Sequence, residues 1–158
     1  MMAKEIEQKF LVVGETWREA ATGSKELRQF YLATGDGRSV RVRVADGSQA
    51  RLTLKFGGVG RIRDEFEYDL PLEDAAEMQA FAIGTPIIKT RHIVPVGKHV
   101  WEVDEFSGVL AGLVMAEVES AQPVPATERP SWVGREVTED GTYYNLSLAL
   151  KGLPEGVT

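Results

Sequence analysis

The feature that constrains the fold most is a two-residue alternation of charged and apolar side chains that recurs along the chain. Residues 38–45 read RSVRVRVA, in which valines alternate with Arg41 and Arg43. Successive side chains of a β-strand point to opposite faces, so each such segment predicts a strand with one apolar and one charged face. The alternation predicts eight strands, near residues 4–13, 27–34, 38–45, 50–57, 60–70, 86–94, 98–106 and 109–119.

Turn residues and a few helical patterns complete the predicted fold. Gly35-Asp36-Gly37 and Asp46-Gly47 lie between predicted strands, where they favour tight hairpins. Helical patterns occur near 16–21, after Pro71 and near 142–150. We therefore expect an α+β fold of one domain over residues 1–158, dominated by antiparallel sheet, with a few covering helices.

The charges within each predicted strand tend to share one sign, as in Arg-x-Arg and Glu-x-Glu. A half-exposed sheet also has a polar face, but like charges two residues apart repel, so another partner must favour them. If the strands close into a β-barrel, the apolar face packs outward and the charged face lines the interior. Unpaired buried ions cost several kcal/mol each, so such an interior must contain water.

Composition excludes several classes of protein. The 158 residues include 18 Lys and Arg against 24 Asp and Glu, a net charge of -6 that disfavours nucleic-acid binding through bulk charge. The absence of cysteine excludes disulfides and thiolate metal sites. The sequence has no apolar run long enough to span a membrane, and MMAKEIEQK does not read as a signal peptide, so we expect a cytoplasmic protein.

A space that offers both cations and carboxylates suits a polyanion bound together with a divalent metal. Arginine and lysine bind phosphate oxygens, and carboxylates bind Mg²⁺ or Mn²⁺. Glu5 and Glu7 lie two apart on one predicted strand, so both carboxylates can hold the same ion. His92 and His99 show no metal-binding spacing and are expected to be surface or structural residues.

The segment EIEQKFLV, with Glu5, Glu7 and Lys9 in the pattern ExExK, resembles the signature of the CYTH superfamily, the triphosphate tunnel metalloenzymes. The likeness continues in VRVR, LTLK, RIRDEFEYDL, IIKTRH, WEVDEF and GLVMAEVES, and so covers nearly the whole chain. The resemblance implies an eight-stranded antiparallel tunnel that binds a small-molecule triphosphate, with a divalent metal on its acidic side.

The resemblance also implies roles for individual residues. The catalytic candidates are Lys9, Glu5 and Glu7. The metal-ligand candidates are Glu5, Glu7, Glu117 and Glu119. The substrate-binding candidates are Arg41, Arg43, Lys55, Arg63, Lys89 and Arg91. Four acids, which either bind a second metal or orient neighbouring bases, are Glu65, Glu67, Glu102 and Asp104.

Two alternatives remain open at this point. Lys9 either contacts phosphate near the bond that breaks or forms a salt bridge to Glu7 or Glu67. The expected reaction is metal-dependent hydrolysis of inorganic tripolyphosphate to pyrophosphate and phosphate. The other functions are an enzyme acting on a nucleoside or organic triphosphate, of the adenylyl cyclase or thiamine triphosphatase type, and a sensor that binds triphosphate or polyphosphate without cutting it.

Overall fold

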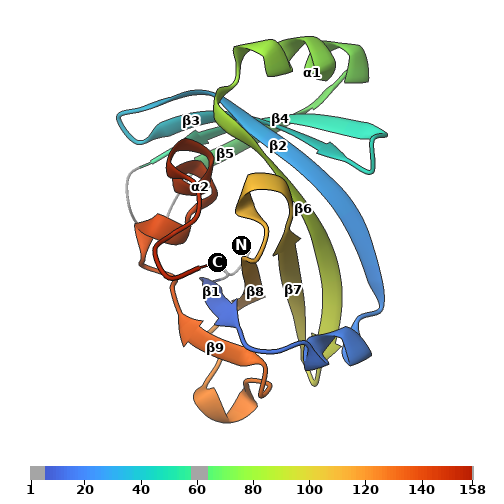
Figure 1. Cartoon of the computed structure of the whole chain (residues 1–158), viewed down its shortest axis with the longest axis vertical. Helices are drawn as coiled ribbons and strands as arrows, with labels where there is room; N and C mark the ends of the chain where they lie inside the picture. The colour runs from blue at the N-terminus through green and yellow to red at the C-terminus, as the bar shows by residue number, and fades with distance from the viewer. Residues whose placement is uncertain (1–5, 58–63, 158) are drawn as a thin grey trace.

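The computed structural model describes residues 6–57 and 64–157. The described residues form one antiparallel sheet of nine strands, in the order β5-β4-β3-β2-β6-β7-β8-β1-β9 (Figure 1). The strands are β1 Ile6–Val12, β2 Gly23–Gly35, β3 Arg38–Ala45, β4 Gln49–Phe56, β5 Asp64–Leu70, β6 Ile83–Val96, β7 His99–Phe106, β8 Val114–Ser120 and β9 Val133–Glu136.

Two α-helices and five short 3₁₀ turns accompany the sheet, which confirms the α+β class. The α-helices are α1 Leu72–Met78 and α2 Asn145–Lys151, and the 3₁₀ turns are η1 Thr16–Ala20, η2 Gln79–Phe81, η3 Gly108–Leu110, η4 Ala126–Glu128 and η5 Gly141–Tyr143. In the part of the chain that the structure describes, no helix is long and apolar enough to cross a membrane.

The sheet curls strongly, but its edges do not pair, so the predicted eight-stranded closed barrel is wrong in two respects. β5 and β9 form the edges, and no ladder joins them within the described ranges. The ninth strand, β9, has only four residues, too few for the alternation to reveal. The expected strand over 109–119 begins only at Val114, because the turn η3 occupies its first residues. We call the concave inner side of the curled sheet the trough.

The hairpin turns form where Asp-Gly pairs predicted them. Asp36 and Asp46 have positive φ angles of 51°, and each is followed by a glycine that also has positive φ. Aspartate and glycine tolerate this left-handed conformation, which matches the twist of antiparallel strands. The Asp46-Gly47 turn sets the register of β3 with β4, while the register of β2 with β3 shifts once between Tyr31 and Ala33.

The apolar side chains on the convex face form two clusters. One cluster lies beneath α1 and contains Phe30, Val42, Ala50 and Ala75. The other lies beneath η1 and the segment before β9, and its buried side chains are Phe10, Trp17, Val94, Trp101, Val103, Ala116, Val118, Val124 and Trp132. The prediction that the apolar face packs outward is confirmed for these strands.

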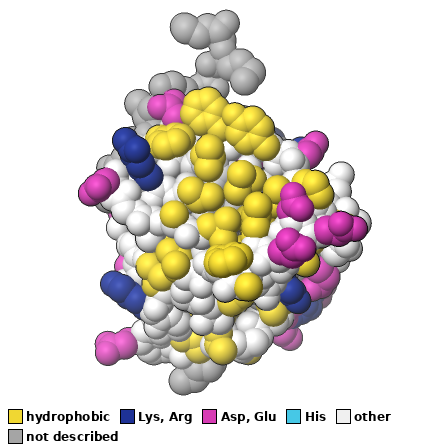
Figure 2. All heavy atoms as spheres, turned by 90° about the horizontal axis from the view of Figure 1, so that it is seen from above, with side chains coloured by type: hydrophobic (Ala, Val, Ile, Leu, Met, Phe, Trp, Pro, Cys, Tyr) yellow, Lys and Arg dark blue, Asp and Glu magenta, His cyan; other side chains and the backbone are white. Residues whose placement is uncertain are grey.

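The apolar cover ends at β5, where Phe66 and Tyr68 stay half exposed. Leu72 and Phe81, which follow this strand in sequence, are exposed as well. Figure 2 shows hydrophobic side chains gathered on the face seen from the α1 side, with charged side chains around them. The apolar side of this edge strand therefore stays partly uncovered.

The helix α2 lies on the concave side of the sheet, not on its outer surface (Figure 1). Its Leu148 and Ala149 pack in a third apolar cluster with Tyr31, Ile87 and Phe106, which extend from the inner face of the sheet. The inner face is therefore charged over part of its length only, because the charged stripes end in apolar residues that α2 covers. Apolar side chains fill the trough at this end.

We expect Gly84→Ala to loosen α2 from the sheet. Gly84 has a φ of 69°, and a Cβ there would clash with the backbone oxygen of Ala149 in α2. Strain and overpacking together should lower the free energy of unfolding by about 3 kcal/mol, measured by urea denaturation.

The matched control is Gly97→Ala, because Gly97 has a similar φ of 60° but no described atom within 4 Å of the place that an added methyl group would take. This variant should lose only about 1 kcal/mol. Equal losses in the two variants would contradict a close contact between α2 and Gly84.

Candidate functional site

The strand register places the charged stripes on one face, the concave face of the trough. Lys9 pairs with Glu117 and Glu7 with Glu119 across β1 and β8, and Arg91 pairs with Asp104 across β6 and β7. Followed through every ladder, the register puts these predicted site residues on the inner face: Glu7, Lys9, Arg41, Arg43, Lys55, Glu65, Glu67, Lys89, Arg91, Glu102, Asp104, Glu117 and Glu119. Glu5 and Arg63 lie outside the described residues.

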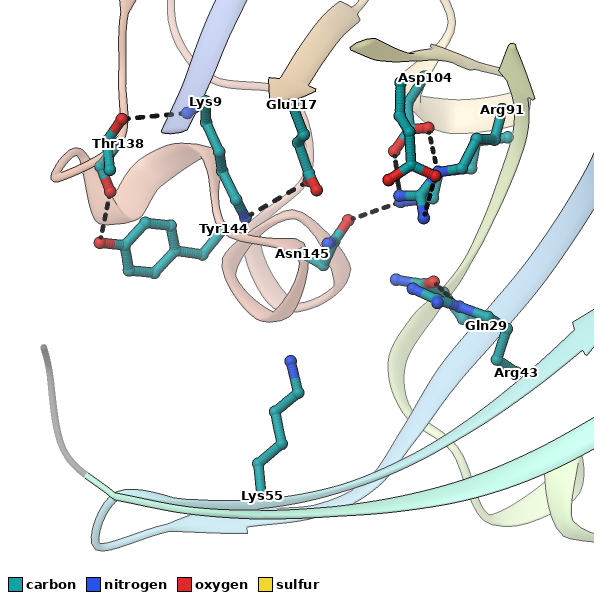
Figure 3. Close-up of polar contacts among 12 residues, drawn as sticks. Lys9, Gln29, Arg43, Lys55, Arg91, Asp104, Glu117, Thr138, Tyr144 and Asn145 are labelled. Atoms are coloured by element: carbon teal, nitrogen blue, oxygen red, sulfur yellow. Dashed lines mark hydrogen bonds and ion pairs between the residues drawn. The ribbon is translucent and has the colours of Figure 1, made fainter. Parts of the chain in front are cut away.

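At the centre of the trough, one buried carboxylate holds two buried cations (Figure 3). The Asp104 oxygens accept hydrogen bonds of 2.8 Å from Nε and Nη2 of Arg91. The Nζ atom of Lys89 lies 2.8 Å from Asp104 Oδ2, and it also donates to Asn145 Oδ1 of α2 at 3.4 Å. The Lys89 side chain is completely buried.

Burial and pairing shift the pKa values of this cluster in opposite directions. Burial alone would raise the pKa of Asp104, but Lys89 and Arg91 hold it well below its usual value. Burial lowers the pKa of Lys89 to about 8, although Asp104 opposes the shift. The pKa of Arg91 is lowered by burial but raised more by its hydrogen bonds and charge pairing with Asp104, so Arg91 stays charged.

A second group of cations lies beside this cluster on β3. Arg41 is 6% exposed and donates to Thr53 Oγ1 at 3.4 Å, and Arg43 donates to Gln29 Oε1 at 2.9 Å. Burial, together with the positive charges of Arg41 and Arg91, lowers the pKa of Arg43 to about 10. These cations repel one another, so the inner face favours an anionic ligand.

The acidic side of the trough lies on β1 and β8. Burial by surrounding protein raises the pKa of Glu7, and the negative charge of Glu117 raises it further. Lys9 lies between the acidic and basic sides: its Nζ is 3.8 Å from Glu117 Oε1 and 5.3 Å from the centre of the Tyr144 ring. The ion pair that Lys9 forms is therefore with Glu117, where the sequence suggested Glu7 or Glu67.

A cavity of about 370 Å³ opens beside these acids, at the end of the trough away from α2. Glu102, Glu117 and Glu119 line it, together with side chains of β6, β7 and the turn between them. Within residues 6–57 and 64–157, no three acids or histidines are close enough to form a complete metal site.

The chemistry of the acidic side nevertheless fits a hard divalent cation. Glu7, Glu117 and Glu119 offer only carboxylate oxygens, the ligands that such ions prefer. Desolvation and the nearby charge of Glu117 raise the pKa of Glu7, although the side chain itself is exposed. A bound cation would favour the charged form of Glu7.

The four acids whose role the sequence left open all contact bases. Asp104 binds Lys89 and Arg91, as described above. The other three contacts are Lys55 to Glu65 at 3.1 Å, Arg51 to Glu67 at 2.9 Å and Arg91 to Glu102 at 3.5 Å.

His92 lies on the outer face of the sheet, whereas His99 borders the cavity beside Glu102, Glu117 and Glu119. The His92 ring packs against Trp17 with ring centres 4.7 Å apart, and its Nε2 is 3.2 Å from Glu105. His99 lies near Glu128, with 3.6 Å between Nε2 and a carboxylate oxygen. The contacts of His92 with Trp17 and Glu105 are those of a structural residue.

Sequence reasoning missed the neutral residues of the inner face. Gln29, Thr53 and Asn145 each contact one of the predicted cations. The prediction followed charged side chains along the strands. Gln29 and Thr53 are uncharged, and Asn145 lies on α2, so this pattern did not identify them. Knowledge that β2 pairs with β3 would have found Gln29, since it lies directly opposite Arg43.

The sequence and the fold of this chain are similar to those of known proteins. The family model of the CYTH domain matches residues 3–150. An inorganic triphosphatase of Acetivibrio thermocellus is 40% identical over 148 residues, which cover 93% of this chain and 94% of the relative. An inorganic triphosphatase of Nitrosomonas europaea is 37% identical over 151 residues, which cover 92% and 97%. The solved structure of the inorganic triphosphatase NE1496 superposes with a TM-score of 0.70 at 31% identity, covering 94% of this chain and 96% of that one.

We expect Asp104→Asn to destabilise the protein strongly, because it leaves buried Lys89 and Arg91 without a compensating charge. Removing one partner of a buried pair should lower the free energy of unfolding by about 3 kcal/mol at pH 7, measured by urea denaturation. The control Glu65→Gln alters a half-exposed pair and should cost at most about 1 kcal/mol.

The pH dependence gives a second measure of the same interaction. The folded-state pKa of Asp104 lies below the usual 3.8, so its contribution is complete above about pH 4 and is lost as the pH falls further. The wild type should therefore lose more stability than Asp104→Asn between about pH 5 and pH 2.5. If the free energies of unfolding of wild type and Asp104→Asn fall equally with pH, the charge of Asp104 does not stabilise the folded protein.

Proposed function

The chain belongs to the CYTH domain family, and from this premise we propose that it is a divalent-metal-dependent hydrolase of inorganic tripolyphosphate. The products are pyrophosphate and phosphate. Its relatives of 37% and 40% identity, which match almost over their full lengths, are named inorganic triphosphatases. The observation that carries the proposal is the imbalance among the buried charges on the basic side of the trough.

In the described residues, three buried cations face a single buried carboxylate. The cations are Arg41, Lys89 and Arg91, and the carboxylate is Asp104. Arg43 adds a fourth, partly buried positive charge. A chain of phosphate groups offers several negative oxygens at once, so it matches this group of donors better than a singly charged ligand. We therefore assign Arg41, Arg43, Lys55, Lys89 and Arg91 to substrate binding.

The acidic side supplies the ligands for a divalent cation in this proposal. Glu7, Glu117 and Glu119 would hold Mg²⁺ or Mn²⁺, joined by Glu5, which precedes Glu7 by two residues in the sequence. When bound, the cation would act as a Lewis acid toward phosphate oxygens.

The remaining residues orient the phosphate-binding side chains and exclude water. Asp104 fixes Arg91 through two hydrogen bonds and anchors Lys89, so both cations are preorganised for an anion. Lys9 lies where the acidic and basic sides meet, and there its ammonium group would stabilise charge on the phosphate that is cut. The apolar cluster around α2 keeps water out of one end of the trough.

Glu65, Glu67 and Glu102 serve as orienting groups in this proposal, not as ligands of a second metal. Each carboxylate contacts a lysine or arginine, at distances between 2.9 and 3.5 Å. These contacts restrict the long basic side chains before substrate binds.

We expect the enzyme to prefer tripolyphosphate over ATP by about tenfold or more in kcat/KM. Tyr31 and Phe106, aromatic residues on the inner face, are buried against the cluster of α2 and are not available to stack on a base. The measurement is a panel of tripolyphosphate, ATP, thiamine triphosphate and longer polyphosphate, with released phosphate, pyrophosphate and cyclic AMP quantified.

The panel separates the alternatives. Equal or faster turnover of ATP, or cyclic AMP among the products, would favour a nucleotide enzyme. Binding without release of phosphate in the presence of Mg²⁺ or Mn²⁺ would favour a sensor.

We expect Glu7→Gln and Glu119→Gln to lower metal-dependent kcat about a hundredfold or more while the fold stays intact. Each substitution removes a carboxylate from a region of like charge, and the raised pKa of Glu7 indicates that its charged form is disfavoured in the folded protein. The melting temperature at neutral pH should therefore stay unchanged or rise.

The matched control is Glu105→Gln, which changes a carboxylate that binds Arg18 on the opposite face of the same sheet. It should leave kcat and the metal requirement unchanged. If Glu7→Gln and Glu119→Gln retain full turnover at saturating metal, these residues are not metal ligands.

A further inference from the structure

Gln29 is a completely buried polar side chain in the middle of the basic cluster. It lies on the inner face of β2, with Arg43 of β3 on one side and Ile87 of β6 on the other. Figure 3 shows it beside Arg43, on the side of the trough that faces Arg91 and Asp104. Neither the sequence pattern nor the family comparison assigns it a role.

The orientation of the Gln29 amide is fixed by its neighbour. Arg43 Nε donates to Gln29 Oε1 at 2.9 Å. A guanidinium group has only donors, so the amide oxygen must face Arg43 and the amide nitrogen must point away from it. That nitrogen, Nε2, is buried and has no hydrogen-bond acceptor within residues 6–57 and 64–157.

The surroundings of Nε2 explain why the protein supplies no acceptor. The one buried carboxylate in the described part of the chain, Asp104, is already bound by Arg91 and Lys89. Arg41 Nε on the neighbouring strand is likewise buried without an acceptor among the described residues. Two unsatisfied donors among like-charged cations call for an acceptor with several negative oxygens, which a phosphate group provides.

We propose that Gln29 is a substrate-binding residue, whose Nε2 donates a hydrogen bond to a non-bridging phosphate oxygen while its Oε1 aligns Arg43. This role for Gln29 rests on the proposed function, because the anion that it binds is the triphosphate substrate. A neutral donor at this point binds phosphate without adding a further positive charge to cations that already repel one another. An arginine or lysine there would increase that repulsion.

Two substitutions separate direct binding from an effect transmitted through Arg43. Gln29→Met has nearly the same shape but neither hydrogen-bonding group. Gln29→Glu keeps an acceptor for Arg43 and replaces the donor with a negative oxygen. The affinity for tripolyphosphate is measured by titration calorimetry with EDTA present, so that no turnover occurs.

We expect Gln29→Met to raise the Kd for tripolyphosphate about tenfold, and Gln29→Glu to raise it at least as much. Wild-type affinity in Gln29→Glu combined with weak binding by Gln29→Met would overturn direct binding and leave Gln29 as a positioning residue for Arg43. Unchanged affinity in both variants would overturn the proposal entirely.

The chain offers a matched control in Gln8. Its side chain is also buried, but it lies on the convex side, where it donates to Glu136 at 3.2 Å and accepts from the backbone N of Val124 at 2.7 Å. Gln8→Met should lower the melting temperature and leave the Kd unchanged. Gln29→Asn, which keeps the amide but withdraws it by one methylene, replaces Gln29→Met if that variant does not fold, and the same rise in Kd is expected.

The experiment distinguishes this proposal from the proposed hydrolysis. Wild-type protein that binds tripolyphosphate but releases no phosphate with Mg²⁺ or Mn²⁺ would refute the hydrolysis, while the Kd values of the variants would still decide the role of Gln29. Hydrolysis by the wild type with unchanged Kd in the variants would refute only the role of Gln29.

Discussion

The buried contact of Asp104 with Lys89 and Arg91 is the interaction on which the trough depends. It joins β6 to β7 at the centre of the sheet and allows two cations to be held away from water. One carboxylate does not compensate all the buried positive charge in the described residues, since Arg41 is buried nearby. The buried part of the trough therefore keeps an excess of positive charge that a polyanion would neutralise, although the whole chain is acidic, and this would link stability to the proposed substrate.

The convex face of the sheet provides apolar packing, and the concave face carries the charged residues of the candidate site. Burial of aromatic and aliphatic side chains on the convex face, around Phe10 and Trp101, provides the apolar contacts that hold the strands together. This leaves the concave face able to carry charges that would otherwise prevent folding. The helix α2 divides the concave face in turn, because its Leu148 and Ala149 cover the apolar end of the stripes and leave the charged part open.

The candidate site is organised as a basic side and an acidic side that meet at Lys9. The groups that we propose for phosphate binding lie on β2, β3, β4 and β6, while the proposed metal-ligand carboxylates among the described residues lie on β1 and β8. With this division, basic side chains would bind the anion and carboxylates would bind an adjacent divalent cation. Gln29 and Asp104 fit the same scheme: one orients Arg43 and the other orients Arg91, so the cations are positioned before the substrate arrives.

The sequence by itself determined eight strands, two Asp-Gly hairpins, the family and which residues share the charged face. All of these depend on local alternation and on motifs read along the chain. The inner position of Arg41, Arg43, Lys89 and Asp104 was predicted in this way, while Glu5 and Arg63 lie outside the described residues. Only the tertiary structure decided that the sheet stays open, that β9 adds an edge, that α2 enters the trough and that Gln29 faces Arg43. These features depend on which strands become neighbours and on what packs between them, and such long-range choices leave no periodic signal in a single sequence.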